Sequence, residues 1–511
     1  MRLLSHRRTT RTLLVLAILL GMYAVAVTAV AAVAPAAKFA SASERRTYVE
    51  SLRDRTRIAK EAAVVWATAR NLPVRGDDGT RTYELMSIED GRPLYYITDN
   101  ANAAISTAAD KIRNTIPYDV NGQDLTVGVW DGGAILATHQ EFGSRVSVKD
   151  GASVHYHATH VGGTIGAAGV VSSARGMAPS VDLDSYDWTS DTAEMASRAA
   201  STAGEVDKIY LSNHSYGIIS GWYYLSAGNS WSGQAGYHWP NWITWGASAV
   251  DDAFGQYDTN ARTYDEVAYN APYYLVFKSA GNDRSNNPSN GETVYYYSGG
   301  TWHSLSYSSA SAPGGDGVYD GGYDTVSSVG NAKNIMTVGA AYDAVSGGSR
   351  RVASGTMSSF SGWGPSDDGR IKPDIVANGV ALYSTDDDSD SDYASRSGTS
   401  MSTPNACGSA ALIVDYYGDL FPGAAMRAST LKALIIHTAD DVGNAGPDYA
   451  YGWGLMNTLA AAEHLTVHQD NLNRSFLLED QLSTGSPSDS HAFRSDGSGP
   501  IRATIGWTGP P

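Results

Sequence analysis

Three short motifs supply an acid, a base and a hydroxyl nucleophile, in that order along the chain. Asp131 ends the apolar run VGVWD, where burial can fix its carboxylate. His157 stands in HATHVGGTIGA at the predicted start of a helix, and Ser400 lies in the glycine-rich turn SGTSMSTP before another helix. The positive end of that helix favours negative charge beside the serine. An aspartate that orients a histidine, and a histidine that takes a serine proton, form the arrangement needed for acyl transfer.

Taken together, these motifs resemble those of the subtilisin-like serine proteases, the subtilases, which carry Asp, His and Ser in this order. HATHV at His157 is similar to the family's H-G-T-H-V, and GTSMSTP around Ser400 is similar to its G-T-S-M-A-x-P. The blocks NHSYG, SAGN, FSGWGP, IKPDIVANG and PDYAYGWGLMN extend the resemblance over roughly residues 120–465. We therefore expect the subtilisin-like fold, an α/β structure with a mostly parallel sheet flanked by helices.

The resemblance also implies a role for each matched residue. Asp131, His157 and Ser400 form a catalytic triad, and the side-chain amide of Asn282 in SAGN completes the oxyanion hole. Protein or peptide substrates are then hydrolysed through an acyl-enzyme on Ser400, with no cofactor in catalysis. The alternative is a catalytically inactive member of the same fold that acts as a surface binding protein. The resemblance assigns the substrate pocket to Ser215, Tyr216, Gly217, Ala280 and Gly281.

One motif departs from the common pattern, because Gly132-Gly133 stands where the family usually has Ser or Thr after the aspartate. WDGG followed by THQEF resembles the larger alkaline, oxidatively stable subtilases, which carry a β-sandwich after the catalytic domain. IRATIGWTGPP at the end of the chain resembles an early strand of such a sandwich. About 45 residues cannot close two sheets, so we expect residues 466–511 to be the start of an incomplete, truncated β-domain.

Alternating apolar runs and helical stretches predict the elements that position these residues. LTVGVW, VDKIYLSNHS, YYLVFKSAGN and NIMTVGAAY are predicted strands, and site residues collect at their carboxyl ends. We assign residues 117–465 to the catalytic domain. Residues 35–116 form an N-terminal extension or a propeptide, with a helical pattern over 44–66 and two short strands around the turn at 90–93.

Several other features have two interpretations. Two loops rich in Trp and Tyr, beginning at GWYYLSAGNSW and TVYYYSGGTW, either shape substrate subsites or form their own clusters over the sheet edges. The acidic run with Asp386, Asp388 and Asp390 is either a calcium site or, as is more common, a solvated loop. The family resemblance supports a structural calcium ion without locating it. His160 and Cys407 are predicted to be structural.

Composition excludes some partners and indicates export. Lys and Arg total 36 against 53 Asp and Glu, a net charge of −17, so nucleic acid is not expected as a partner. The single cysteine permits no intramolecular disulfide. Residues 1–34 combine four arginines, an apolar run and small residues, which predicts a signal peptide and a secreted or periplasmic protein. An uncleaved membrane anchor is the alternative; after cleavage no stable membrane association is expected.

Overall fold

The structure is a computed structural model that describes residues 61–511, except 70–73, 78–81, 90–91, 98–99, 240–244, 248, 299, 319–320, 473–475, 481–489, 492–496 and 498–500. The predicted signal peptide and most of the predicted helix over 44–66 lie outside the described residues. Within the described part, no helix is long and apolar enough to cross a membrane.

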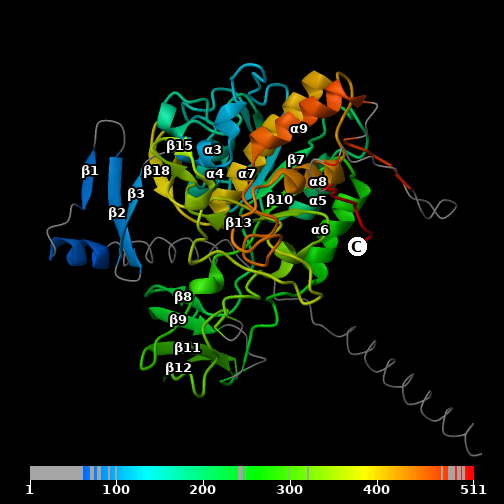
Figure 1. Ribbon diagram of the computed structural model, residues 1–511. Coiled ribbons are helices and arrows are strands. Elements are labelled where there is room, and N and C mark those ends of the chain that lie inside the picture. Colours follow the sequence, from blue (N-terminus) through cyan, green and yellow to red (C-terminus); the bar gives the residue numbers. More distant parts are fainter. Residues whose placement is uncertain are drawn as a thin grey trace, which may run out of the picture. The chain divides into compact units, whose positions relative to one another are not determined.

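A seven-stranded sheet forms the centre of the main body, and all its strands are parallel (Figure 1). Its order is β16-β13-β10-β7-β4-β6-β5, which confirms the predicted α/β class. The four predicted strands are β4, β7, β10 and β13. Each has a run of buried residues, because both faces of a parallel sheet are covered. The strands are β4 (Thr126–Asp131), β5 (Val146–Val148), β6 (Asp182–Asp187), β7 (Leu211–His214), β10 (Leu275–Ser279), β13 (Met336–Ala341) and β16 (Ile375–Asn378).

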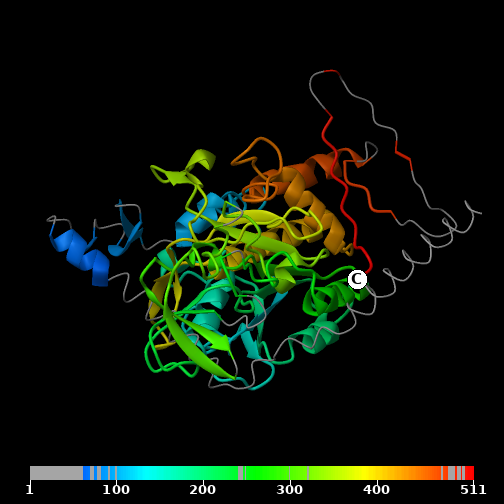
Figure 2. The same cartoon turned by 90° about the horizontal axis from the view of Figure 1, so that it is seen from below.

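Helices cover both faces of this sheet. The larger hydrophobic core joins one face to α3 (Asn100–Ser106), α4 (Tyr156–Gly166), α7 (Thr399–Leu420), α8 (Ala428–Thr438) and α9 (Thr458–Asp470). A smaller core joins the other face to α5 (Asp191–Arg198) and α6 (Thr259–Asn270). Figures 1 and 2 both show α7, α8 and α9 grouped together, in yellow-orange to orange-red.

Short elements complete the main body. Two hairpins pair β14 (Val345–Ser346) with β15 (Ser349–Arg350), and β17 (Leu382–Thr385) with β18 (Tyr393–Arg396). Single turns of 3-10 helix are η1 (Ala109–Lys111), η2 (Ser172–Ala174), η3 (Asp283–Ser285), η4 (Ser328–Asn331) and η5 (Val352–Ser354).

The predicted N-terminal extension contains two kinds of structure. Residues 61–68 are helical, and β1 (Arg75–Asp77), β2 (Thr82–Glu89) and β3 (Arg92–Ile97) form an antiparallel sheet, which includes the two predicted strands. Residues 100–116 differ, because Ala103, Ala104 and Ile112 are buried in the main hydrophobic core. Residues ahead of the predicted domain boundary at 117 therefore already pack into the main body, while residues 114–117 at the boundary itself are exposed.

Each of the two aromatic loops contains two strands. β8 (Tyr223–Leu225), β9 (Gly236–Trp239), β11 (Thr293–Ser298) and β12 (Thr301–Ser306) form a four-stranded sheet with order β12-β11-β9-β8. Trp222, Trp239 and Tyr307 are buried in a small hydrophobic core of their own. The structure therefore favours the interpretation that these residues form a separate cluster. Cross-strand aromatic pairs such as Tyr296 and His303, with ring centroids 5.3 Å apart, stabilise the sheet.

The predicted strand IRATIGWTGPP is absent, since residues 501–511 contain neither helix nor strand. Their polar groups bond to the main body instead. Gly509 N–H donates to Asn334 Oδ1 at 2.8 Å, and Asn334 Nδ2 donates to the Gly509 carbonyl at 2.8 Å. The apolar side chains of Ile505 and Trp507 stay exposed. The described residues after 471 contain no strand of the predicted β-sandwich.

Candidate active site

Asp131 and His157 meet at the carboxyl end of β4. Asp131 is the last residue of β4 and only 1% exposed, while His157 is the second residue of α4. His157 Nδ1 lies 2.7 Å from Asp131 Oδ1 and 2.9 Å from Oδ2. The His155 side chain caps α4 by accepting from the His157 backbone N–H at 3.3 Å. The buried carboxylate is therefore placed to orient the imidazole, whose side chain remains 18% exposed.

The Gly132-Gly133 pair is explained by what surrounds it. The Gly132 N–H donates to Asp131 Oδ1 at 2.7 Å, so a backbone group takes the place of the missing hydroxyl. A Cβ on Gly133 would lie 2.6 Å from the Ser153 carbonyl oxygen, and one on Gly132 would lie 3.0 Å from the Trp188 ring. The chain therefore passes too close to its neighbours for a side chain at Gly133.

Ser400 is the second residue of α7, in the first turn, where backbone N–H groups have no partner within the helix. Its Oγ donates to the Ser215 carbonyl at 3.0 Å, and Ser215 Oγ donates to the Ser400 carbonyl at 3.0 Å. Pro404 is the sixth residue of the helix and lies beyond its first turn. Because Pro404 has no N–H, the Ser400 carbonyl loses its usual helical partner and accepts from Ser215 instead.

Asn282 follows β10 and contacts the start of α7. Its Oδ1 accepts from the Thr399 N–H at 2.8 Å and from Thr399 Oγ1 at 3.1 Å. Since those two donors hold the amide oxygen, the NH₂ group is the end left to donate to a substrate oxygen. Gly281 N–H also donates to Thr399 Oγ1, at 3.2 Å. The Asn282 side chain is thus hydrogen-bonded to the N-terminus of α7, the helix that carries Ser400.

The predicted pocket residues occupy two segments beside Ser400. Ser215 and Gly281 contact the start of α7 directly, Ala280 is buried, and Gly217 has open space around its α-carbon. Tyr216 differs, because its hydroxyl points into the interior, where it donates to Asp191 Oδ2 at 2.7 Å. Tyr216 therefore contributes backbone to this edge, while its side chain anchors the segment from below.

Two buried charged residues were not predicted. Lys278 on β10 donates from Nζ to the Tyr216 carbonyl and, at 3.0 Å, to Ser279 Oγ. Glu141 accepts from the N–H groups of residues 169–171 at 2.6–2.9 Å and from the Tyr393 hydroxyl at 2.8 Å. A lysine inside the apolar run LVFKS was the only sequence signal for the first. Glu141 in THQEF gave no local signal of its partners.

The remaining predicted residues lie apart from this centre. His160 Nε2 is 3.0 Å from the carbonyls of both Leu382 and Ala394, and burial lowers its pKa well below the usual value. Cys407 is buried in α7, which raises the pKa of its thiol. Both residues have the structural environments that were predicted.

The acidic run forms the turn between β17 and β18. Asp386 pairs with Arg396, and Asp390 Oδ1 accepts from Thr138 Oγ1 at 2.6 Å. In the described part of the chain, no cluster of three or more His, Cys, Asp or Glu side chains suits a metal ion. Asp386, Asp388 and Asp390 therefore do not converge on a preformed calcium site, and calcium binding stays a prediction.

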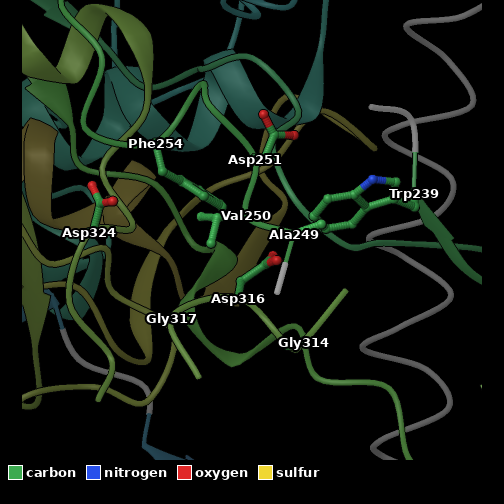
Figure 3. Close-up of a pocket in the computed structure, with 10 residues that line it drawn as sticks. Trp239, Ala249, Val250, Asp251, Phe254, Gly314, Asp316, Gly317 and Asp324 are labelled. Carbon is green, nitrogen blue, oxygen red and sulfur yellow. The ribbon is translucent and has the colours of Figure 1, made fainter. Parts of the chain in front are cut away.

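Two hollows have none of Asp131, His157 and Ser400 in their linings. One, of about 10 Å³, is bordered by Asp251, Asp316 and Asp324 beside Trp239 of the aromatic sheet (Figure 3). Asp251 and Asp316 accept from the N–H groups of Gly221 and Trp222, so two of these carboxylates hold a turn. The other, about 450 Å³, is an open cleft lined by residues that include Arg284, Tyr323, Trp363 and Tyr451.

The sheet is parallel, and the Asp131–His157 pair and the start of α7, with Ser400 in its first turn, lie at the carboxyl ends of its strands. These features define an α/β protein of the subtilisin-like fold. The family model described as the Subtilase family matches residues 137–454, more than half of the sequence. The chain belongs to the subtilase family. Among solved structures, the CspB protease of Clostridium perfringens has a TM-score of 0.50 at 14% identity, covering 72% of this chain and 99% of that chain. This likeness shows the fold.

Curated relatives match parts of the chain. Subtilisin DY of Bacillus licheniformis is 32% identical over 153 residues, 29% of this chain and 50% of that protein. Serine protease AprX of Bacillus subtilis is 34% identical over 148 residues, 26% of this chain and 30% of that protein. C5a peptidase of Streptococcus pyogenes is 45% identical over 72 residues, 14% of this chain and 6% of that protein. The chain thus spans half or less of the length of these relatives.

Proposed function

We propose that this chain is an exported serine endopeptidase that hydrolyses proteins or peptides through an acyl-enzyme on Ser400. The observation that carries the proposal is the bond between buried Asp131 and His157 Nδ1, which leaves the other imidazole nitrogen to act as a base. Membership of the subtilase family, and similarity to subtilisin DY and to serine protease AprX, support the same activity.

The proposed reaction assigns one step to each group. Ser400 Oγ turns from the Ser215 carbonyl toward His157, gives its proton to Nε2 and attacks the substrate carbonyl carbon. The Asn282 amide and the Ser400 N–H donate to the oxyanion, and Asp131 stabilises the imidazolium. His157 then returns the proton to the leaving amine, and water repeats the sequence to release the acid. The step uses neither Cys407 nor a metal ion.

A serine-directed phosphonylating reagent tests the assignment directly. We expect one equivalent to label Ser400 and abolish casein hydrolysis, while Ser400→Ala takes up no label and has no activity. Ser402→Ala is the matched control, since Ser402 is buried in the same helix and its hydroxyl donates to the Thr399 carbonyl. Labelling of another residue would disprove the role of Ser400. Absence of both labelling and hydrolysis would support the alternative, an inactive binding protein.

Export and calcium binding complete the proposal, and each has its own measurement. The arginine-rich, apolar start of the sequence supports a signal peptide. N-terminal sequencing and intact mass of secreted material should show the loss of residues 1–34, whereas a retained segment would support an anchor. If a structural calcium ion is bound, EDTA should lower the melting temperature while activity before unfolding persists. An unchanged melting temperature would remove calcium from the proposal.

A further inference from the structure

Two segments flank Ser400, and both are bonded to the start of α7. Ser215, one residue before Tyr216, exchanges two hydrogen bonds with Ser400. On the other side Gly281 and Asn282 bond to Thr399. The distance between the two segments decides how a peptide lying along one of them presents its carbonyl to the serine and the amide donor.

Lys278 connects these two segments below the helix. It lies on β10, three residues before Gly281, and its Nζ donates to the Tyr216 carbonyl on the opposite segment. The same ammonium donates to Ser279 Oγ at 3.0 Å and approaches the Ser279 carbonyl at 3.4 Å. Hydrogen bonds and short stretches of backbone therefore form a closed ring. Lys278 bonds to Tyr216, the neighbouring Ser215 bonds to Ser400 in α7, and Thr399 of α7 bonds to Gly281, which follows Lys278 in the chain.

The free-energy cost of burying the Lys278 ammonium argues that this residue does not serve stability alone. Lys278 is 2% exposed, and within the described residues no carboxylate forms an ion pair with it. Burial of an unpaired ammonium is unfavourable, and an apolar side chain of similar volume is often neutral or stabilising at such a position. Desolvation accordingly lowers the pKa of Lys278 to about 7, against the opposing attraction of Asp191 and Asp131.

The side chain of Tyr216 is fixed at its far end as well. Its hydroxyl donates to Asp191 Oδ2, lies 2.8 Å from Tyr264 Oη and lies 2.8 Å from His214 Nδ1. The Lys278 ammonium sits 5.2 Å from the centre of the Tyr216 ring. Tyr216 is thus held through its hydroxyl by α5, α6 and β7, and through its carbonyl by Lys278.

We propose that Lys278 is a positioning residue, which holds the segment Ser215–Gly217 at a fixed separation from Gly281–Asn282 so that a peptide substrate binds in register with Ser400. The inference rests on the proposed function. Hydrolysis of a peptide substrate by the wild-type enzyme tests that function, while only the comparison of variants below tests Lys278.

The test measures kcat, KM and melting temperature for Lys278→Met on a series of peptide substrates. We expect KM to rise about tenfold, the scale of one charge-assisted hydrogen bond, with kcat changed less than about threefold. The melting temperature should stay the same or rise. Lys372→Met is the control, because Lys372 is equally buried but paired with Asp374 at 2.8 Å, in the segment just before β16. It should lower the melting temperature and leave KM unchanged.

The pH dependence of KM gives a second readout that also serves if Lys278→Met fails to fold. The groups that face Lys278 are His214 on β7, Tyr216, Tyr264 on α6, Asp191 on α5 and Asp131 on β4. As pH rises through about 7, the ammonium loses its charge, so wild-type KM should rise. Lys278→Gln should have a high, flat KM. Below pH 7, where the wild-type Lys278 is charged, a KM for Lys278→Met or Lys278→Gln equal to the wild-type value would overturn the proposal.

Discussion

A buried carboxylate lies beside each end of α4, but the partners of the two groups differ. At the first end Asp131 accepts from one backbone N–H and from the ring of His157, which is partly exposed. Beyond the last residue of the helix, Glu141 accepts from three backbone N–H groups and from the Tyr393 hydroxyl. Both carboxylates are almost fully buried.

The comparison shows that burial alone does not separate a site for chemistry from a structural contact. Backbone N–H groups cannot change their protonation near neutral pH, so Glu141 can only hold residues 169–171 in place. His157 can gain a proton, and Asp131 is placed to stabilise the charge that results. The carboxylate next to a titratable, partly exposed partner is the one that suits catalysis.

The largest expected effect comes from Asp131→Asn. Because the amide no longer fixes the imidazole tautomer, turnover should fall by about 10⁴, a magnitude known from the corresponding change in a Ser-His-Asp protease. The melting temperature should change little, since the amide is isosteric. Steady-state kinetics and thermal unfolding of the same preparation provide the two readouts. A loss below about tenfold would show that something other than Asp131 orients His157.

Glu141→Ala should produce the opposite pattern. It removes the charged acceptor of three backbone N–H groups in a partly exposed segment, and each hydrogen bond to a charged group contributes about 1.5–3 kcal/mol. We expect the free energy of unfolding to drop by several kcal/mol, with turnover at low temperature close to wild type. Urea unfolding at neutral pH measures this. Glu266→Ala, at an exposed ion pair with Arg262, is the matched control and should have little effect.

The glycines after Asp131 allow a finer comparison at the catalytic end. Gly133→Ala would press against the Ser153 carbonyl oxygen at 2.6 Å and the Cβ of His155 at 2.9 Å, which displaces the residue that caps α4. Turnover should fall about tenfold, with a stability loss of about 1–3 kcal/mol from overpacking. Gly132→Ser meets only the edge of the Trp188 ring at 3.0 Å and should change turnover modestly. Equal losses in both variants would contradict this account.

The sequence predicts much of the sheet because the site strands are apolar runs that end at polar corners. β6 was missed, since DLDSYD looks like an exposed loop. Its Asp184 is buried through ion pairs with Lys149 and Arg198, neither of them adjacent in sequence. Local periodicity contains no information about such distant partners.

The candidate site likewise contains residues that the sequence predicts and residues that it does not. Asp131, His157, Ser400 and Asn282 could be predicted because each sits in a motif with a family resemblance. The bond from Lys278 to Tyr216 spans 62 residues, and the bond from Tyr393 to Glu141 spans 252. Both depend on how the elements pack, so a reading of the sequence finds the reacting groups and misses the groups that position them.

The smallest expected effect concerns His160, three residues after His157 on α4 and bonded to carbonyls instead of a carboxylate. Its pKa in the fold lies well below the ordinary value of 6.5, because burial and the nearby Arg396 disfavour the charged ring. As pH falls below about 6.5 the unfolded chain binds a proton here that the folded chain does not, so stability is lost.

His160→Gln retains an N–H donor for those carbonyls but cannot titrate. It should cost little at pH 7 and remove up to one proton from the pH dependence of unfolding, roughly 1.4 kcal/mol per pH unit below 6.5. Part of the acid sensitivity will persist, because burial also lowers the pKa values of His214 and His238. Urea unfolding at pH 7 and pH 5 measures the difference. If the variant loses as much stability as wild type between pH 7 and pH 5, the fold tolerates a charged His160. Bonding to carbonyls instead of a carboxylate would then not keep the His160 ring neutral.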